Sequence, residues 1–255
     1  MSSLLELVLE ANGADRFASL STITATARYG GSFWEVKGHP DYAGAAVVEA
    51  RAHEQWIRQT DADGGVQMVF DRAANLITVT ESNGDVIEEL HDPRRSFDGY
   101  TERSVWSEAQ MAYFRCYATW LHLVEPFVFA FPGVTSHEIA AHSEHGEIWR
   151  GLSVTFPPEV DSHNRTQLYY FDEEYRLRRS DVQPEVDDYT KTTQYVAEHV
   201  EIDGITLSTS RRVHLRLPDR SPDTTRTPVT VDLSDIHLDS TNVPREATAV
   251  RIPPE

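Results

Sequence analysis

The sequence predicts an α+β fold in which one large curled antiparallel β-sheet, a half-barrel of about eleven strands, surrounds a central pair of apolar helices. Most of the chain consists of short segments in which apolar and polar residues alternate between turn residues. The longest apolar stretch, residues 104–133, lies near the middle of the chain. A sheet of this width must curl, and we expect the apolar stretch to fill its concave face.

The chain begins with a predicted helix that leads into a long strand. Ser2 or Ser3 can cap a helix that extends to about Ala11, and Asn12-Gly13 is a typical helix stop. In the segment 22–29, apolar residues alternate with threonines, which predicts a half-buried strand.

Hairpin signals recur on both sides of the apolar stretch. Residues 66–70 and 76–80 alternate on either side of a polar turn, and Asp203-Gly204 separates two alternating runs near the C-terminus. In the last predicted strand, the apolar positions change face near Ser234-Asp235. This change of phase predicts a β-bulge.

The apolar stretch itself predicts a helix, a break and a second helical piece. Ser107 and Gln110 have the spacing of a capping box. The residues that follow are apolar on most sides, which is typical of a helix buried on several faces. Glu125-Pro126 ends this helix, because proline disfavours helical geometry in the residue before it. Phe127–Phe131 then continue as a second apolar piece.

Composition limits the classes of partner. The formal net charge of −18 comes from 41 acidic and 23 basic residues. This balance argues against nucleic acid as a partner, because phosphate binding needs clustered Lys and Arg. It also argues against an anionic membrane surface, and we expect no membrane insertion. No phosphate-binding or metal motif is visible, so the sequence predicts no cofactor.

One domain, residues 1–242, and a C-terminal tail, residues 243–255, account for the 255 residues. The sequence leaves the oligomeric state open. Cys116 is the single cysteine, and it lies within the apolar helix, where we expect a buried thiol. The first residues lack a basic segment followed by a long apolar run, so we expect a cytoplasmic protein.

The order of elements resembles the LolA/LppX-like half-barrel superfamily of lipoprotein carriers. The resemblance rests on the helix and first strand of residues 4–29 and on the three C-terminal segments QLYYFDEEYRLRRSD, HVEIDGITLSTSRRVHL and TVDLSDIHL. The resemblance implies a wide sheet round an apolar cavity that helices cover, and it transfers no catalytic residue. The carriers have an export signal and no heavy aromatic helix. We therefore expect this chain to be a cytosolic relative that handles a smaller apolar molecule.

Two clusters of polar residues contain chemically active types but do not predict a site. On a helix, Glu138, His142 and His145 would line one face at metal-ligand spacing, but the surroundings predict a hairpin, in which His137 and His142 point to opposite faces. The sequence therefore predicts no metal site. Asp161-Ser162-His163 contains the residue types of a catalytic triad, but sequence neighbours cannot adopt triad geometry.

The first functional hypothesis is a protein that binds a hydrophobic small molecule in an apolar cavity between the sheet and the central helices. The second is a cofactor-independent cyclase, isomerase or hydrolase that acts on an apolar metabolite in that cavity. The candidate acid–base residues are His122, His163 and His199. The candidate ligand-binding residues are Trp34, Tyr113, Tyr117, Trp120 and Glu125. A purely structural or interaction protein is the third and least favoured hypothesis.

Overall fold

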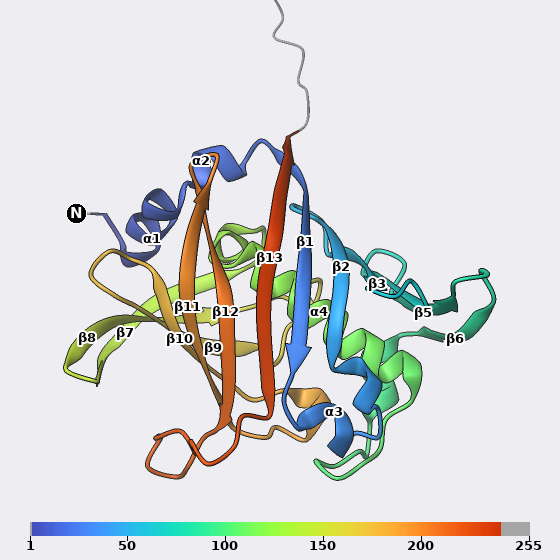
Figure 1. Ribbon diagram of the computed structural model, residues 1–255. Coiled ribbons are helices and arrows are strands. Elements are labelled where there is room, and N and C mark those ends of the chain that lie inside the picture. The colour runs from blue at the N-terminus through green and yellow to red at the C-terminus, as the bar shows by residue number, and fades with distance from the viewer. Residues whose placement is uncertain (1, 241–255) are drawn as a thin grey trace, which may run out of the picture.

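A computed structural model describes residues 2–240 of the chain. Within this range, thirteen strands form a single sheet in the order β6-β5-β4-β3-β2-β1-β13-β12-β11-β10-β9-β8-β7 (Figure 1). All neighbouring strands are antiparallel. The strands are β1 (Leu20–Gly30), β2 (Gly44–Arg51), β3 (Trp56–Asp61), β4 (Val66–Asp71), β5 (Leu76–Glu81), β6 (Val86–His91), β7 (Thr135–Glu144), β8 (Glu147–Thr155), β9 (Thr166–Phe171), β10 (Leu177–Val182), β11 (Thr192–Ile202), β12 (Ile205–Leu215) and β13 (Val229–Ser240).

The large curled antiparallel sheet was predicted correctly, but the sequence count of about eleven strands was too low. The segment from β9 to β10 shows the reason. A turn separates these strands without any Gly or Pro, because Tyr175 itself adopts the positive φ of 60° that a glycine usually supplies. Such a turn leaves little trace in the sequence.

The first and last strands lie side by side at the centre of the sheet (Figure 1). The register pairs Leu20 with Ser240 and Gly30 with Thr230. It shifts between Thr24 and Thr26, opposite the residues that flank Asp235, whose φ is 50°. The β-bulge predicted near Ser234-Asp235 is therefore present. The bulge moves the apolar residues of β13 from one face to the other.

Four α-helices and four 3₁₀ helices accompany the sheet in the part of the chain that the structure describes. The α-helices are α1 (Leu4–Asn12), α2 (Ala14–Phe17), α3 (Phe33–Val36) and α4 (Glu108–Val124). The 3₁₀ helices are η1 (Pro40–Tyr42), η2 (Pro93–Phe97), η3 (Phe127–Ala130) and η4 (Glu185–Asp187). Within residues 2–240, no helix combines the length and hydrophobicity that crossing a membrane requires.

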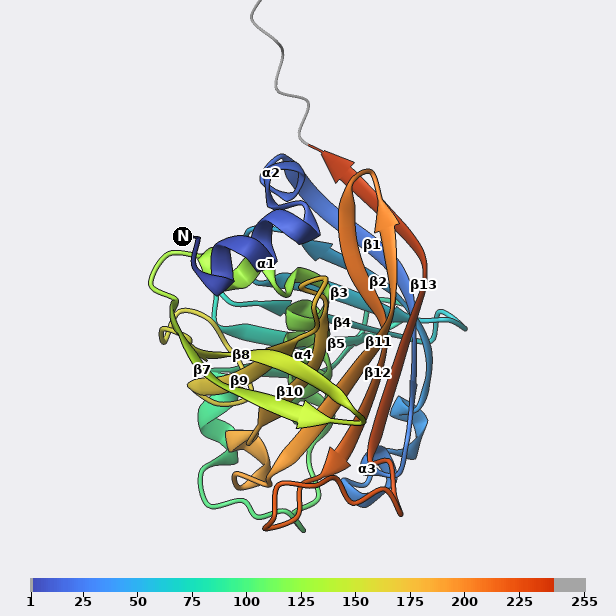
Figure 2. The same cartoon turned by 90° about the vertical axis from the view of Figure 1, so that its left-hand side faces the viewer.

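Helix α4 lies inside the curve of the sheet, with contacts to β3–β6 on one side and β12 on the other (Figure 2). Its capping box forms as predicted, with the Ser107 side chain accepting from the Gln110 amide and the Gln110 side chain accepting from the Ser107 amide. Every residue from Ala109 to Val124 is buried.

The predicted central pair of helices is a single α-helix followed by a short 3₁₀ turn. Glu125 leaves helical geometry, with ψ at 135°, before Pro126. The next helical piece, η3, has only four residues before Phe131 becomes extended. So short a segment cannot build an α-helical ladder, because its end groups outnumber its internal hydrogen bonds.

The N-terminal helix α1 is present, and it packs on β8 and β12. The Ser3 side chain accepts from the Glu6 amide at its start, and Gly13 ends it with φ at 87°. The predicted tail, residues 243–255, lies outside the described residues.

Candidate functional site

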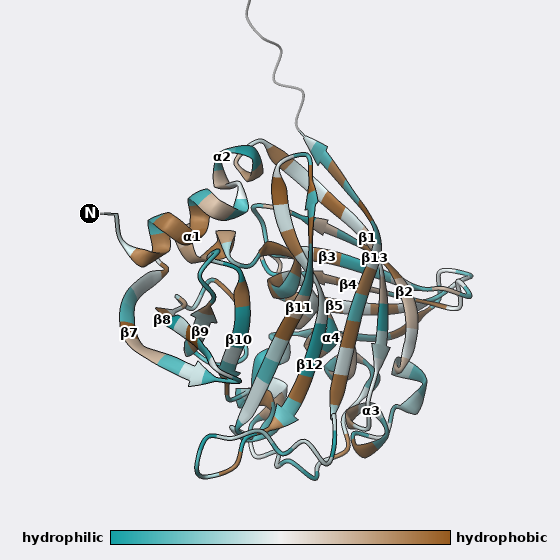
Figure 3. Cartoon of the chain, turned by 60° about the vertical axis from the view of Figure 1, so that its left-hand side comes forward, coloured by the Kyte–Doolittle hydropathy of each residue, from teal (hydrophilic) through white to brown (hydrophobic). Residues whose placement is uncertain are grey.

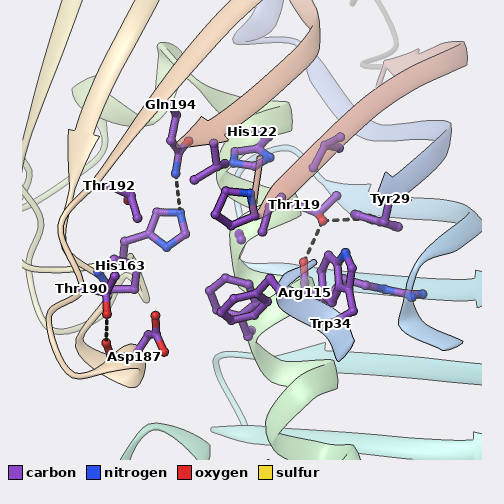
Figure 4. A pocket seen from close by; sticks show the side chains of 18 of the residues that line it. Tyr29, Trp34, Arg115, Thr119, His122, His163, Asp187, Thr190, Thr192 and Gln194 are labelled. Atoms are coloured by element: carbon purple, nitrogen blue, oxygen red, sulfur yellow. Dashed lines mark hydrogen bonds between the residues drawn. The ribbon is translucent and has the colours of Figure 1, made fainter. Parts of the chain in front are cut away.

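A hollow of about 70 Å³ lies between α4 and the inner face of the central strands. Its walls come from α3, α4, β1, β11, β12, β13 and the segment 184–190. Figure 4 shows His122 from α4 and His163 from the opposite wall beside this hollow. The lining residues are Tyr29, Phe33, Trp34, Phe114, Arg115, Ala118, Thr119, His122, His163, Pro184, Asp187, Thr190, Thr192, Gln194, Val213, Leu215, Pro228, Val229 and Val231.

Most of the wall is apolar because the strands alternate as half-buried strands do. Figure 3 shows hydrophobic and hydrophilic residues alternating along β12 and β13. The inward positions include Val213 and Val231, which line the hollow. On the side of α3, the Phe33 and Phe114 rings lie 5.0 Å apart, and the Trp34 indole donates to the Gly30 carbonyl at 2.9 Å. These contacts hold the aromatic wall in place.

The inner end of the hollow is polar. Three residues from different elements form a chain of hydrogen bonds there: Arg211 of β12, Gln194 of β11 and His163. Arg211 donates to Gln194 Oε1 at 3.2 Å, and Gln194 Nε2 lies 3.2 Å from His163 Nε2. On the other side of the ring, His163 Nδ1 lies 3.3 Å from the Tyr117 hydroxyl.

This chain determines the tautomer of His163. A guanidinium only donates, so the Gln194 oxygen faces Arg211 and the Gln194 amino group faces the imidazole. His163 Nε2 must then accept, and Nδ1 carries the proton. Burial lowers the pKa of His163 to about 3, and the charges of Arg211 and Arg94 lower it further. His163 is therefore neutral at physiological pH, with both ring nitrogens engaged.

His122 is in a different position. Its side chain lines the hollow and is 7% exposed, yet neither ring nitrogen has a hydrogen-bond partner among the described residues. Burial lowers the pKa of His122 well below its usual value, the charges of Arg211 and the nearby His163 add to this effect, and the neighbouring Gln194 side chain opposes it. Its ring centroid lies 6.5 Å from that of His163. His122 is thus a buried neutral imidazole beside Gln194 whose two ring nitrogens make no hydrogen bond of normal geometry with the described residues.

Glu125 belongs to a buried ion pair behind the hollow. Arg211 donates to Glu125 Oε2 at 2.5 Å, and the Tyr169 hydroxyl donates to Glu125 Oε1 at 2.9 Å. Both charged side chains are almost fully buried. Because a buried charge is costly unless it is paired, the carboxylate is committed to Arg211. Glu125 itself does not line the hollow.

The outer end of the hollow opens toward α3. A second hollow of about 270 Å³ shares residues with the first at this end. The shared residues are Phe33, Asp187, Thr190, Leu215 and Pro228. Lys37, which follows α3, bridges this mouth with an ion pair to Asp187 at 2.5 Å. The Lys37 side chain is only 1% exposed and also donates to the Glu102 carbonyl at 2.8 Å.

The other sequence candidates lie near the hollow or away from it. The Tyr113 hydroxyl donates to Asp161 at 2.8 Å, and the Trp120 indole donates to the Arg51 carbonyl at 2.9 Å. Tyr117 lies behind His163. Of the predicted residues, Trp34, His122 and His163 line the hollow, whereas Tyr113, Tyr117, Trp120, Glu125 and His199 do not.

The remaining polar clusters are used within the structure. Asp161 accepts from Tyr113 and pairs with Arg72, while the Ser162 hydroxyl donates to the Asn164 carbonyl. On β7, His142 lies 3.4 Å from Glu144. Within residues 2–240, no group of three or more His, Cys, Asp or Glu side chains is placed to hold a metal ion.

Sequence reasoning missed Arg211 and Gln194 as part of the site. A signal for Arg211 was present, because it interrupts an apolar face that runs from Ile205 through Leu207 to Val213. A lone cation on an inward strand face requires a buried partner. The identity of that partner, Glu125, was not visible because 86 residues separate the two.

Comparisons with known proteins bear on the fold. No protein-family model matches the sequence, and no curated protein matches it. Three solved structures share its architecture. A LolA superfamily protein from Nitrosomonas europaea is 14% identical with a TM-score of 0.54, over 92% of this chain and 94% of that one.

A DUF1329 family protein from Desulfovibrio piger is 12% identical with a TM-score of 0.53, over 92% of each chain. A putative outer membrane lipoprotein-sorting protein domain from Vibrio parahaemolyticus is 10% identical with a TM-score of 0.52, over 93% of this chain and 92% of that one. The chain therefore has a LolA-like fold. Identities this low establish the fold and leave the ligand to be argued from the residues.

Proposed function

We propose that the chain binds a hydrophobic small molecule in the hollow between α4 and the inner face of the sheet. One observation carries this proposal: a mostly apolar hollow contains a buried histidine, His122, whose two ring nitrogens have no hydrogen-bond partner among the described residues. An unsatisfied buried polar group costs about 1–3 kcal/mol. A ligand that offers a polar group to His122 would recover this free energy.

Binding requires the mouth of the hollow to open. Pockets that hold drug-sized ligands measure about 300–1,000 Å³, whereas the inner hollow measures about 70 Å³. The outer hollow adjoins it below α3 and adds about 270 Å³. We therefore expect α3 and the segment 184–190, which Lys37 and Asp187 join, to move apart when a ligand enters.

We favour the binding hypothesis over the enzyme hypothesis for a structural reason. A cofactor-independent enzyme needs an acid–base group that faces its substrate. Both nitrogens of His163 are engaged by Tyr117 and Gln194, and His199 lies outside the hollow. His122 would have to act alone, because neither of its ring nitrogens makes a hydrogen bond with a described residue that would orient the ring.

Filling the hollow tests the proposal. Ala118 lines it from α4 and is 7% exposed, so Ala118→Leu would occupy the space that a ligand needs. Binding of the apolar dye N-phenylnaphthylamine, followed by its fluorescence, should weaken about tenfold or more. The midpoint of thermal unfolding should stay the same or rise, because the added carbons pack in an existing hollow.

The matched control is Ala141→Leu, which makes the same change at an exposed position of β7 and should leave dye binding unaltered. A second blocking variant, Val229→Leu, narrows the hollow from β13 and should also weaken binding. Equal dye affinity in the wild type and in both blocking variants, all shown to be folded by circular dichroism, would overturn the proposal.

A further inference from the structure

We infer that the ligand of this hollow is an apolar alcohol, whose hydroxyl group is held by His122 at the inner end while its apolar body extends toward α3. The inference rests on the proposed function and specifies the chemistry of the ligand. Three features of the hollow support it: the direction of its polarity, the pairing of the charges around it, and the hydrogen-bonding capacity of His122.

The polarity of the hollow orients a ligand. The strand pairing places Thr192 opposite Leu215 and Gln194 opposite Val213. Thr192 and Leu215 lie toward the mouth, because Leu215 also lines the outer hollow. Gln194 lies two residues deeper, together with the inner histidines (Figure 4). A ligand that enters under α3 therefore passes Thr190 and the Lys37–Asp187 pair at the mouth, then the mostly apolar walls, and reaches the two histidines at the inner end.

The charges around the hollow exclude an ionised head group. Each of the three buried cations at the inner hollow has an acidic partner: Arg115 pairs with Asp61 at 2.8 Å, Arg211 with Glu125 at 2.5 Å, and Lys37 with Asp187 at 2.5 Å. None of these is left to balance a buried carboxylate or phosphate. Burying an unpaired charge costs far more than burying a neutral hydroxyl group.

His122 matches a hydroxyl group in particular. A neutral imidazole has one nitrogen that donates and one that accepts, and both nitrogens of His122 are free. Because the two nitrogens point to opposite sides of the ring, one hydroxyl group pairs with one of them, and it can pair with either, by donating to the bare nitrogen or by accepting from the N–H. His163 does not compete for this role, because its two nitrogens are engaged by Gln194 and Tyr117, and the Gln194 oxygen already accepts from Arg211.

Competition against bound N-phenylnaphthylamine tests the inference with three matched compounds. These are decanol, undecane, which has the same number of non-hydrogen atoms, and decanoate, which is ionised at pH 8. Decanol should displace the dye at about tenfold lower concentration than undecane, because a site built for a hydrogen bond rejects a ligand that lacks one. Decanoate should be the weakest of the three.

Variants of His122 assign the effect to its ring. His122→Leu should make decanol and undecane equal, and it should fold, because it replaces an unpartnered buried polar group with an apolar one. His122→Gln keeps a donor and an acceptor and should retain part of the preference. The control is His199→Leu, because His199 Nε2 is also buried without a partner but lies outside the hollow. This control should leave the preference unchanged.

The possible failures are distinguishable. Equal displacement by decanol and undecane in the wild type would overturn the inference and leave hydrophobic binding intact. Strongest displacement by decanoate would also overturn it and would identify an acidic ligand. Absence of dye binding by the folded wild type would overturn the proposed function itself.

Discussion

Two buried histidines face the same hollow, and their hydrogen bonds give them different roles. His163 is held between Tyr117 and Gln194, so its ring is oriented and its nitrogens are occupied. His122 has neither constraint. A buried polar side chain without a partner is rare in folded proteins and calls for a physical explanation. Its place on the wall of an apolar hollow makes ligand recognition the explanation that we favour.

The lowered pKa of His163 predicts a loss of stability in acid. The pKa is 6.5 in the unfolded chain and about 3 in the folded one. The contribution to stability is therefore complete above pH 6.5 and is lost as the pH falls from 6.5 toward 3. Between pH 7 and pH 5, His163 should lower the free energy of unfolding by about 2 kcal/mol.

Urea unfolding of the wild type and of His163→Gln at these two pH values measures how much His163 changes the free energy of unfolding. Because other groups titrate equally in both proteins, the difference between their pH dependences isolates His163. The wild type should lose about 2 kcal/mol more than the variant between pH 7 and pH 5. Identical pH dependences would show that His163 is not buried as a neutral ring.

At the scale of elements, the docking of α1 depends on one glycine. Gly13 has φ at 87°, and a Cβ built there would lie 1.9 Å from the Gly204 carbonyl oxygen in the β11–β12 turn. Gly13→Ala should therefore move α1 away from the hairpin. We expect the free energy of unfolding to fall by about 2–3 kcal/mol, since a positive φ and a backbone clash both oppose the methyl group.

Gly84→Ala is the matched control, because Gly84 has φ at 90° but nothing lies within 4 Å of the added Cβ. Gly84→Ala therefore loses only the stability that a positive φ costs an alanine, without a steric clash. Chemical denaturation of both variants should show the larger loss at Gly13. If the two losses were the same, the close approach of α1 to the hairpin would be wrong.

At the scale of the whole molecule, the first and last strands join two halves of the sheet. One half contains β1–β6, the other contains β7–β13, and α4 contacts strands of both. The buried hydrophobic residues form one contiguous cluster across the halves. We therefore predict a single cooperative thermal unfolding transition for the described region, as expected for one shared core.

Two substitutions test this cooperativity from opposite halves. Ile57→Ala in β3 and Leu152→Ala in β8 each remove a fully buried side chain, and each should cost about 2–5 kcal/mol. Differential scanning calorimetry should show that both variants lower the midpoint of the same transition. Two transitions, each responding to only one substitution, would establish separate folding units.

The sequence by itself determined the local elements. The serine cap of α1, the capping box of α4 and the bulge near Asp235 could be predicted because each depends on residues close together in the chain. The concentration of apolar residues in 104–133 also predicted which helix the sheet would enclose. The turn at Tyr175 was harder to predict from the sequence, because a residue other than glycine adopts the positive φ there.

Only the tertiary structure decided which side chains form the site. Trp34, His122 and His163 were predicted and line the hollow, but so do Gln194 and Arg115, which had no sequence signal as ligand residues. His163 makes a hydrogen bond with Gln194, a residue from a distant strand, whereas the ring nitrogens of His122 meet no such partner among the described residues. Hydrogen-bond satisfaction is a property of atoms brought together by folding, so periodicity along the chain cannot reveal it.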